Sequence, residues 1–430
     1  MRWRIVGSLA CVGLATACMP AGGMPSVAKA PVCDAQIPDS QCLIAEAASA
    51  LGEVNKLDDW IIAGAEYAEA LNAAGHEGAA ISFIRDAWTQ TQGITDPTSR
   101  ARLQSALLKS WLKLDPKGPS IAALDSAIGL SRTLDDGAQK QDILAALIAM
   151  QVYASRGEKA LSDARALPET DSTAASYKAR ALREIANNAA AKGDFTLAQS
   201  AIAEISKGLA YYGHVARTDV ALHAAKAGRT ELMNRLLGEA EKGARSDPDG
   251  YFAGAALRDA AVVRARYGDP KMAKAMFEEA ISLTVKAKSK QEHARAMSRI
   301  VTGMADAGLA EPVHALATLQ TANAIGAGED RQVMRDFVSY EVAGSAAFAG
   351  LFDFARGLVD QAPETPFGSA TTLKSVMQRD LAWGLMRDGQ QDSAIETARA
   401  ITAPRERAQT LARLVILRAH PDMEAPARYL

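Results

Sequence analysis

The sequence predicts an all-α protein in which pairs of helices are stacked along the chain. Two observations support this prediction. The 430-residue chain is 48% hydrophobic but only 5% aromatic, and it is rich in alanine, which favours helices because its side chain loses no entropy there. Glycine-centred junctions also recur along most of the chain, whereas stretches of alternating β-branched residues are scarce.

Positive and negative side chains almost balance, with 48 Lys and Arg against 50 Asp and Glu. Proteins that hold nucleic acid usually carry a basic surface, and an acidic tail would show as a run of like charges. The balance predicts that no nucleic acid is a partner.

The first residues have the pattern of a targeting segment. Residues 1–4 are basic, and residues 5–15 form an apolar run that is too short to cross a bilayer as a helix. We expect residues 1–17 to be a signal peptide and the protein to be exported. No later stretch has 18 consecutive apolar residues, so no second span is expected.

The small residues 15–17 directly before Cys18 resemble the lipobox of bacterial lipoproteins. The resemblance implies lipidation of Cys18 as a membrane anchor. An Asp directly after the cysteine would change the sorting of the lipoprotein, and this chain has Met19 there. The resemblance therefore also implies a place on the periplasmic side of the outer membrane. The family prefers Leu three places before the cysteine, where this chain has Ala15. The alternative is an ordinary signal peptidase cutting the same bond, which leaves a periplasmic or secreted protein.

Residues 18–41 form a Pro-, Gly- and Ala-rich tether that includes part of a loop between Cys33 and Cys42. Exported proteins meet an oxidising compartment, so a disulfide between Cys33 and Cys42 is expected. Residues 42–430 then form the helical-repeat domain.

Nine junctions place a glycine between two helix-forming segments. Their successive spacings are 43, 39, 36, 35, 40, 40, 42 and 39 residues, and periods in this range are typical of stacked helical repeats. The nine glycines are Gly75, Gly118, Gly157, Gly193, Gly228, Gly268, Gly308, Gly350 and Gly389.

Each junction predicts a helix, a turn and a second helix. The glycine is expected to end the first helix in a left-handed conformation. Asp194 and Asp269 follow their glycines and are expected to cap the second helix. Alanine stands five residues after the glycine in six junctions and seven residues before it in six, and the ninth residue after it is always apolar. We expect these positions to lie in helix–helix contacts.

Polar loops rich in Pro, Asp, Ser and Thr separate the units. One more helix is predicted at residues 405–419 and another at residues 42–55, each closing one end of the stack.

The segments LREIANNAAAKGDFTLAQSAIAEI and LRDAAVVRARYGDPKMAKAMFEEAISL resemble the tetratricopeptide repeat in their small residues, Gly-Asp turn and following alanine. The resemblance covers about residues 57–419 and implies a right-handed α-solenoid of about nine repeats. The spacings exceed that family's 34 residues, so a HEAT-like solenoid, with a longer period, is the alternative.

No constellation for catalysis or metal binding is visible. The six histidines are scattered, no two have the spacing of a helical zinc site, and no nucleophile-elbow or phosphate-loop motif occurs. We therefore predict that the protein is not an enzyme and has no cofactor.

Acidic residues stand nine places before the glycine in six junctions, often just after an arginine, as at Arg183, Arg258 and Arg379. In tetratricopeptide-like stacks the first helix of each pair lines the concave groove, so these arginines could bind carboxylate groups of a partner. The alternative is a ladder of ion pairs that joins one repeat to the next.

Tyr340 and Trp383 are the aromatic candidates for partner binding, because both lie on first helices and exposed aromatic residues often anchor partners. The alternative for Trp383 is that it fills a gap beside Ala382.

These features predict an exported scaffold for protein–protein interactions. Lipoproteins with tetratricopeptide repeats serve as adaptors in envelope assembly or secretion, and this is what the resemblance implies. The alternative is a periplasmic solenoid that binds a small ligand or a glycan, which would require clusters of aromatic side chains.

Overall fold

The structure is a computed structural model that describes residues 39–421 and 423, apart from 207–208 and 368–370. Its described residues form twenty α-helices and one short 3₁₀ helix, η2 (Thr284–Lys286). An isolated bridge between Pro366 and Thr372 is the β-type pairing recorded in this part of the chain. The all-α helical-repeat fold predicted from the sequence is confirmed.

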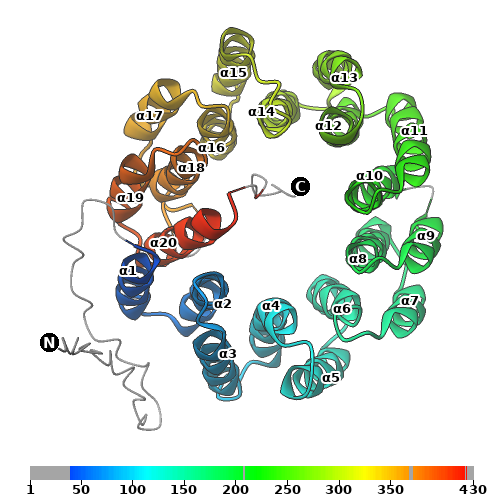
Figure 1. The fold of residues 1–430 in the computed structure, drawn as a ribbon, viewed down its shortest axis with the longest axis vertical. Helices are drawn as coiled ribbons and strands as arrows, with labels where there is room; N and C mark the ends of the chain where they lie inside the picture. The colour runs from blue at the N-terminus through cyan, green and yellow to red at the C-terminus, as the bar shows by residue number, and fades with distance from the viewer. Residues whose placement is uncertain (1–38, 207–208, 368–370, 422, 424–430) are drawn as a thin grey trace, which may run out of the picture.

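The helices form a closed ring with an inner and an outer layer (Figure 1). Each unit consists of an inner helix followed by an outer one. The inner helices are α2 (Leu57–Ala73), α4 (Pro97–Leu114), α6 (Ala138–Met150), α8 (Ser172–Ala191), α10 (Ala210–Lys226), α12 (Gly250–Tyr267), α14 (Lys290–Asp306), α16 (Gln332–Phe348), α18 (Leu373–Arg387) and α20 (Pro404–Ala419). The outer helices are α3 (Glu77–Thr91), α5 (Pro119–Arg132), α7 (Gly157–Arg165), α9 (Phe195–Ala203), α11 (Thr230–Ser246), α13 (Pro270–Leu283), α15 (Pro312–Ala327), α17 (Phe352–Gln361), α19 (Gln391–Arg399) and α1 (Ser40–Gly52).

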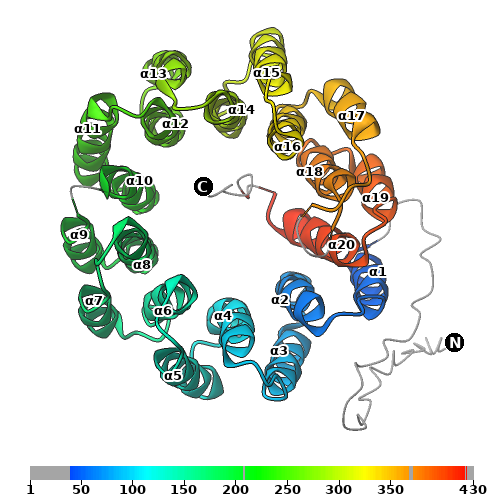
Figure 2. The same ribbon diagram turned by 180° about the vertical axis from the view of Figure 1, so that it is seen from behind.

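The ring closes through a composite unit. The pairs from α2–α3 to α18–α19 give nine units, as predicted. The inner helix α20 has no outer helix following it among the described residues, and α1 packs against it in that place. Both views show α1 outside α20 (Figures 1 and 2). The sequence predicts that each of these helices closes its own end of an open stack. Instead they pack on each other, because each leaves an apolar face that the other buries.

The glycine turns have the geometry that the sequence predicts. Seven of the nine glycines have positive φ, between 55° and 85°. At Gly193 the turn is a Schellman motif: the Gly193 N–H donates to the Ala190 carbonyl and the Asp194 N–H to the Ala189 carbonyl, both at 2.9 Å. Asp194 then accepts from the N–H of Leu197 and so caps α9.

The left-handed conformation predicted for Gly157 and Gly268 is wrong, although Gly268 does lie between its two helices as predicted. Gly157 begins α7, and the left-handed residue of that turn is Ser155, with φ 59°. A Cβ on Gly157 would lie 2.3 Å from Cδ2 of Leu197, so the glycine is needed for close packing. Gly268 ends α12 with a negative φ of −143°.

The burial of the predicted core positions depends on where each turn lies. The alanines five residues after and seven residues before the glycines are all buried. Nine residues after the glycine, Ala166 and Ala317 are exposed, contrary to prediction. Counting from Ser155 instead of Gly157 reaches Ala164, which is fully buried. The turn after Gly308 is longer, so Leu319 takes the core position there.

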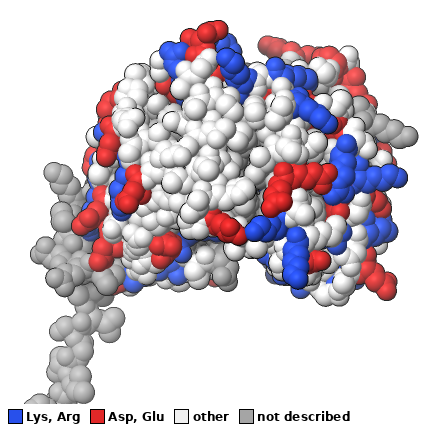
Figure 3. All heavy atoms as spheres, turned by 90° about the horizontal axis from the view of Figure 1, so that it is seen from above, with Lys and Arg blue, Asp and Glu red and all other residues white. Residues whose placement is uncertain are grey.

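One part of the outer wall has few charges. A broad area without Lys, Arg, Asp or Glu is visible from above the ring (Figure 3). Helix α15 lies on this side and has no charged residue. It is therefore held by packing against α14 and α16 and not by surface ion pairs. No helix among the described residues is long and apolar enough to span a membrane.

Candidate functional site

Aromatic and arginine side chains gather along one edge of the ring. The inner helices all run in the same direction, so their N-terminal halves share that edge. We call this surface the edge belt. It comprises Tyr177, Arg180, Tyr211, Tyr212, Tyr251, Phe252, Arg295, Phe337, Tyr340, Phe367 and Arg379.

The belt is continuous between α10 and α12. The ring of Tyr211 lies with its centroid 5.8 Å from that of Tyr212 and 4.8 Å from that of Phe252. Phe252 in turn contacts Tyr251 at 5.6 Å, edge to face. Such tilted and edge-to-face pairs are favourable beyond the area they bury and hold the rings in place.

Arg295 on α14 continues the belt towards α16. Its guanidinium carbon lies 6.0 Å from the ring centre of Tyr251 and 5.6 Å from that of Phe337. The ring of Phe337 contacts Phe367 at 5.1 Å, and Phe367 contacts Tyr340 at 5.5 Å. One cation thus joins the aromatic clusters of two units.

Most of the belt is partly exposed to solvent. Tyr251 is only 4% exposed, whereas the other aromatic members are partly exposed. Side chains of this kind combine a large apolar surface with a polar tip, which is the composition of binding hot spots.

Two of the predicted partner-binding residues, Tyr340 and Arg379, belong to the belt. Nη2 of Arg379 donates to the hydroxyl of Tyr340 at 3.1 Å, and Nη1 donates to Glu406 of the next unit at 3.0 Å. Burial lowers the pKa of Arg379, but the carboxylates of Asp380 and Glu406 outweigh this and hold it well above its ordinary value. The guanidinium is therefore fixed between α16, α18 and α20.

Arg183 and Arg258 have intramolecular partners. Arg183 on α8 pairs with Asp219 on α10 at 2.8 Å, which is the ladder between repeats that we considered as the alternative. Burial raises the pKa of Asp219 to about 6, although Arg183 opposes the shift. Arg258 pairs with Asp259 of its own helix at 2.6 Å. Direct partner contact by these arginines stays a prediction.

Trp383 does not look into a groove. It is 6% exposed and packs edge to face on Phe348 with ring centres 6.0 Å apart. The guanidinium of Arg413 lies 4.9 Å from its ring centre. Trp383 therefore fills space between α16, α18 and α20, as in the alternative reading of the sequence.

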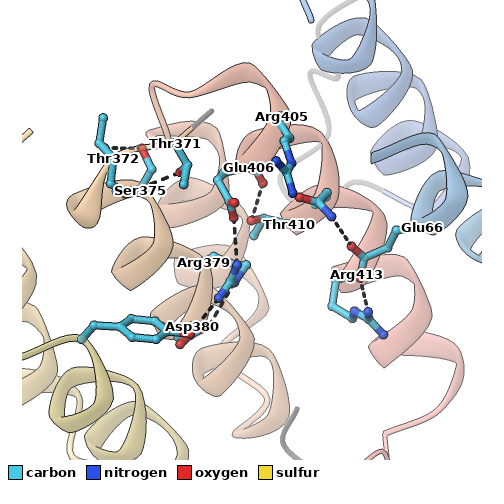
Figure 4. A network of polar contacts seen from close by, with 12 residues as sticks. Glu66, Thr371, Thr372, Ser375, Arg379, Asp380, Arg405, Glu406, Thr410 and Arg413 are labelled. Carbon is cyan, nitrogen blue, oxygen red and sulfur yellow. Dashed lines mark hydrogen bonds and ion pairs between the residues drawn. The ribbon is translucent and has the colours of Figure 1, made fainter. Parts of the chain in front are cut away.

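A polar seam that was not predicted from the sequence closes the ring (Figure 4). Arg413 of α20 pairs with Glu66 of α2, and Arg405 pairs with Asp59 at 3.0 Å. Two further pairs link Arg399 to Glu46 and Arg407 to Glu53, both at 2.5 Å. An acidic residue stands nine places before the glycine in six junctions, and Glu66 is one of these residues. This pattern was a signal for such ion pairs, but it did not identify the partner helix.

A second polar cluster was also missed. On α14, Arg299 donates to Glu341 of α16 at 2.7 Å and to the hydroxyl of Tyr251 on α12 at 3.0 Å. Arg299 and Glu341 are both nearly inaccessible. This cluster lies under the belt and connects three consecutive inner helices.

The predicted signal peptide, lipidation site Cys18 and most of the tether lie outside the described residues. Cys42, in the first turn of α1, is disulfide-bonded. Cys33 also lies outside the described residues, so its pairing with Cys42 stays a prediction. No cluster of three or more potential metal ligands occurs in the described part of the chain.

No family model matches the sequence, and no curated protein matches it. Several solved structures are similar in part. A Rap protein complexed with competence and sporulation factor has 14% identity and a TM-score of 0.32, with 86% of this chain and 99% of that chain covered. Ton1535 from Thermococcus onnurineus NA1 has 13% identity and a TM-score of 0.26, with 82% and 98% covered. A circular tandem repeat protein with novel repeat topology has 14% identity and a TM-score of 0.23, with 89% and 95% covered. TM-scores of this size mean that the overall shapes differ, so these similarities establish nothing about partners.

Proposed function

We propose that the protein is a scaffold for protein–protein interactions and that the edge belt binds an extended segment of a partner polypeptide. The observation that supports this is the chain of contacts between aromatic rings and arginines, most of them partly exposed, that runs from α10 to α18. Tyr and Arg are among the residues enriched at energetic hot spots of protein interfaces. A surface that runs over several units suits an extended chain better than a single compact ligand.

The intramolecular ion pairs define what the partner contacts. Arg379 is held by Tyr340 and Glu406, so its charge is largely compensated. The belt therefore offers aromatic faces with fixed guanidinium groups between them. A partner segment with apolar side chains alternating with acceptor groups matches this surface.

We further propose that this scaffold is a tetratricopeptide-like lipoprotein of the cell envelope, anchored at Cys18 on the periplasmic side of the outer membrane. The basic start, the short apolar run and the small residues before Cys18 support export and lipidation. A role in envelope assembly or secretion, without enzymatic activity, follows from the same resemblance.

Crosslinking in intact cells followed by affinity purification and mass spectrometry tests the scaffold. Wild type is compared with a Phe337→Ala, Phe367→Ala variant, which removes two of the three belt rings between α14 and α18. We expect a specific polypeptide in the wild-type sample and its loss in the variant. Tyr267→Ala is the matched control, because Tyr267 is exposed at the opposite end of α12.

The result depends on intact folding, so circular dichroism and thermal unfolding accompany each variant. A specific partner that remains bound to the double variant would overturn the edge belt as the site. If wild type captures no specific polypeptide, the scaffold itself is refuted.

Labelling with a palmitate analogue tests the anchor separately. We expect label on wild type, none on Cys18→Ser, and release of that variant from the membrane fraction. Unlabelled wild type in a soluble periplasmic fraction would contradict lipidation and favour simple secretion.

A further inference from the structure

A pocket opens at the α6–α10 end of the edge belt. Its volume is about 500 Å³, and its walls come from three consecutive inner helices. The lining residues are Asp142 of α6, Ser172, Thr173, Ser176, Tyr177 and Arg180 of α8, and Tyr212 of α10. Pockets that hold small molecules have volumes of about 300–1,000 Å³.

The charges of this pocket compensate each other. Arg180 donates to the carboxylate of Asp142 and, at 3.3 Å, to its backbone carbonyl. These are the charged residues that line the pocket. Because these opposite charges cancel, the lining carries no net charge that would attract an anion or a cation, so the pocket favours a neutral ligand.

The N-terminus of α8 is also unavailable to an anion. The side chain of Asp171 accepts hydrogen bonds from the N–H groups of Thr173 and Ala174 at 2.8 and 2.9 Å. The helix end that borders the pocket therefore carries its own carboxylate, which repels phosphate or a partner's carboxylate.

Two tyrosines supply aromatic faces that their neighbours hold in place. The guanidinium of Arg180 lies 5.3 Å from the ring centre of Tyr177. Tyr212 contacts Tyr211 edge to face, and Tyr211 contacts Phe252. Both pocket tyrosines are partly exposed.

The remaining lining is rich in hydroxyl groups. Ser172, Thr173, Ser176 and the two tyrosines contribute five hydroxyls, each able to donate one hydrogen bond and accept two. Ser176 uses its proton on the carbonyl of Ser172 at 2.7 Å and keeps its acceptor capacity.

We propose that this pocket binds a neutral saccharide unit. The C–H face of a pyranose ring packs on an aromatic face, as Tyr177 and Tyr212 offer, and its hydroxyls match a rim of hydroxyls beside a paired carboxylate and guanidinium. The aromatic cluster that a glycan-binding solenoid requires is thus present at this place, although aromatic residues are only 5% of the chain. The pocket shares Tyr177, Arg180 and Tyr212 with the edge belt. It lies at the other end of the belt from Phe337 and Phe367, so different substitutions test the two proposals.

Saturation-transfer NMR on the full chain tests the pocket, with calorimetry for the ligands that bind. The probes are N-acetylglucosamine, N,N′-diacetylchitobiose, maltose, glucose and glucose 6-phosphate. We expect at least one neutral sugar to bind, and Tyr177→Ala and Tyr212→Ala each to weaken it about tenfold or more. Tyr212→Phe keeps the ring and should retain most of the affinity, while Tyr267→Ala should bind as wild type does.

Three results would overturn the proposal: no neutral probe binds wild type, the two alanine variants bind as well as wild type, or glucose 6-phosphate binds through these tyrosines more tightly than glucose. Cosedimentation with purified insoluble cell-wall glycan separates the sources of the sugar. Sedimentation that Tyr212→Ala abolishes assigns a wall polymer, and binding of soluble sugars alone assigns a free saccharide.

Discussion

At the scale of single residues, the turn positions explain most of the repeat. Seven glycines adopt a left-handed backbone conformation, and no heavy atom lies near the place that a Cβ would take. Glycine is therefore required there by the backbone conformation and not by a lack of space for a side chain. Ser155 adopts the same conformation with a side chain that disfavours it. The sequence could predict the glycine turns, because only glycine makes them cheaply. It could not predict Ser155, because nothing marks a serine that takes this role.

Substitutions at two equivalent turns should have opposite effects on the stability of the protein. We expect Ser155→Gly to raise the free energy of unfolding by about 1 kcal/mol, because glycine removes the Cβ penalty of the left-handed backbone. Gly193→Ala should lower it by about the same amount, since φ there is 82°. Urea denaturation measures both.

Gly129→Ala is the control for these variants. Gly129 lies inside α5 with open space around it and no positive φ. Alanine at this position should therefore stabilise the helix slightly. Equal effects at Gly129 and Gly193 would contradict a conformational role of the turn glycine.

The raised pKa of Asp219 predicts a pH dependence of stability. Burial raises it from 3.8 to about 6, so the folded state holds a proton that the unfolded state has released between these values. Stability from this group is therefore lost as pH rises through that window. Between pH 4 and 7, wild type should lose up to about 3 kcal/mol relative to Asp219→Asn.

Chemical denaturation at several pH values measures this difference. Asp219 faces Arg183, Glu184 and Asp259, all of which remain in the variant. The exposed Asp353→Asn serves as the control for loss of one negative charge. A wild type that gains stability over Asp219→Asn with rising pH would contradict the prediction.

At the scale of helices, the closeness of neighbouring elements depends on particular small residues. A Cβ on Gly384 of α18 would lie 2.5 Å from the backbone oxygen of Ala347 on α16. The alanines around each turn predicted such close approach correctly, because their small size is visible in the sequence. The edge belt was not predicted as a whole. Its members come from six inner helices and one loop, and only the relative rotation of the units brings them into contact.

Gly384→Ala should therefore destabilise the protein by about 1–3 kcal/mol, because backbone atoms must move to admit the methyl group. Thermal unfolding followed by circular dichroism measures the loss. Gly238→Ala, on α11 with open space around it, is the matched control and should stabilise the helix by up to about 1 kcal/mol. A neutral Gly384→Ala would show that α16 and α18 can separate without cost.

At the scale of the whole molecule, closure distinguishes this protein from an open solenoid. The seam between the α19–α20 segment and the α1–α2 pair combines apolar packing with ion pairs from Arg399, Arg405, Arg407 and Arg413. The sequence indicated the number of units well. Closure was not predictable, because it depends on the sum of small rotations between units, and an error of a few degrees in each accumulates around the ring.

Reversing charge at the seam should open the ring. In an Arg405→Glu, Arg413→Glu variant, acidic side chains would face Asp59 and Glu66 across the seam, and small-angle X-ray scattering should report a larger radius of gyration. Adding Asp59→Arg and Glu66→Arg should restore complementarity and the wild-type curve. Arg165→Glu, which breaks a pair between two consecutive units, is the control and should leave the radius unchanged. An unchanged radius in the double variant would show that apolar packing alone keeps the ring closed.

The composite unit also imposes an order on folding in time. Units from α2–α3 onward can form as they emerge, because each contacts its neighbours alone. Helix α1 cannot: its inner partner α20 follows more than 350 residues later, as the separation of 354 between Arg407 of α20 and Glu53 at the end of α1 shows. Of the described helices, the first to be made must therefore wait for the last, and the apolar face that α20 covers stays uncovered until α20 has been made. An arrested chain that lacks α20 would carry this face permanently and be recognisable to quality control by it.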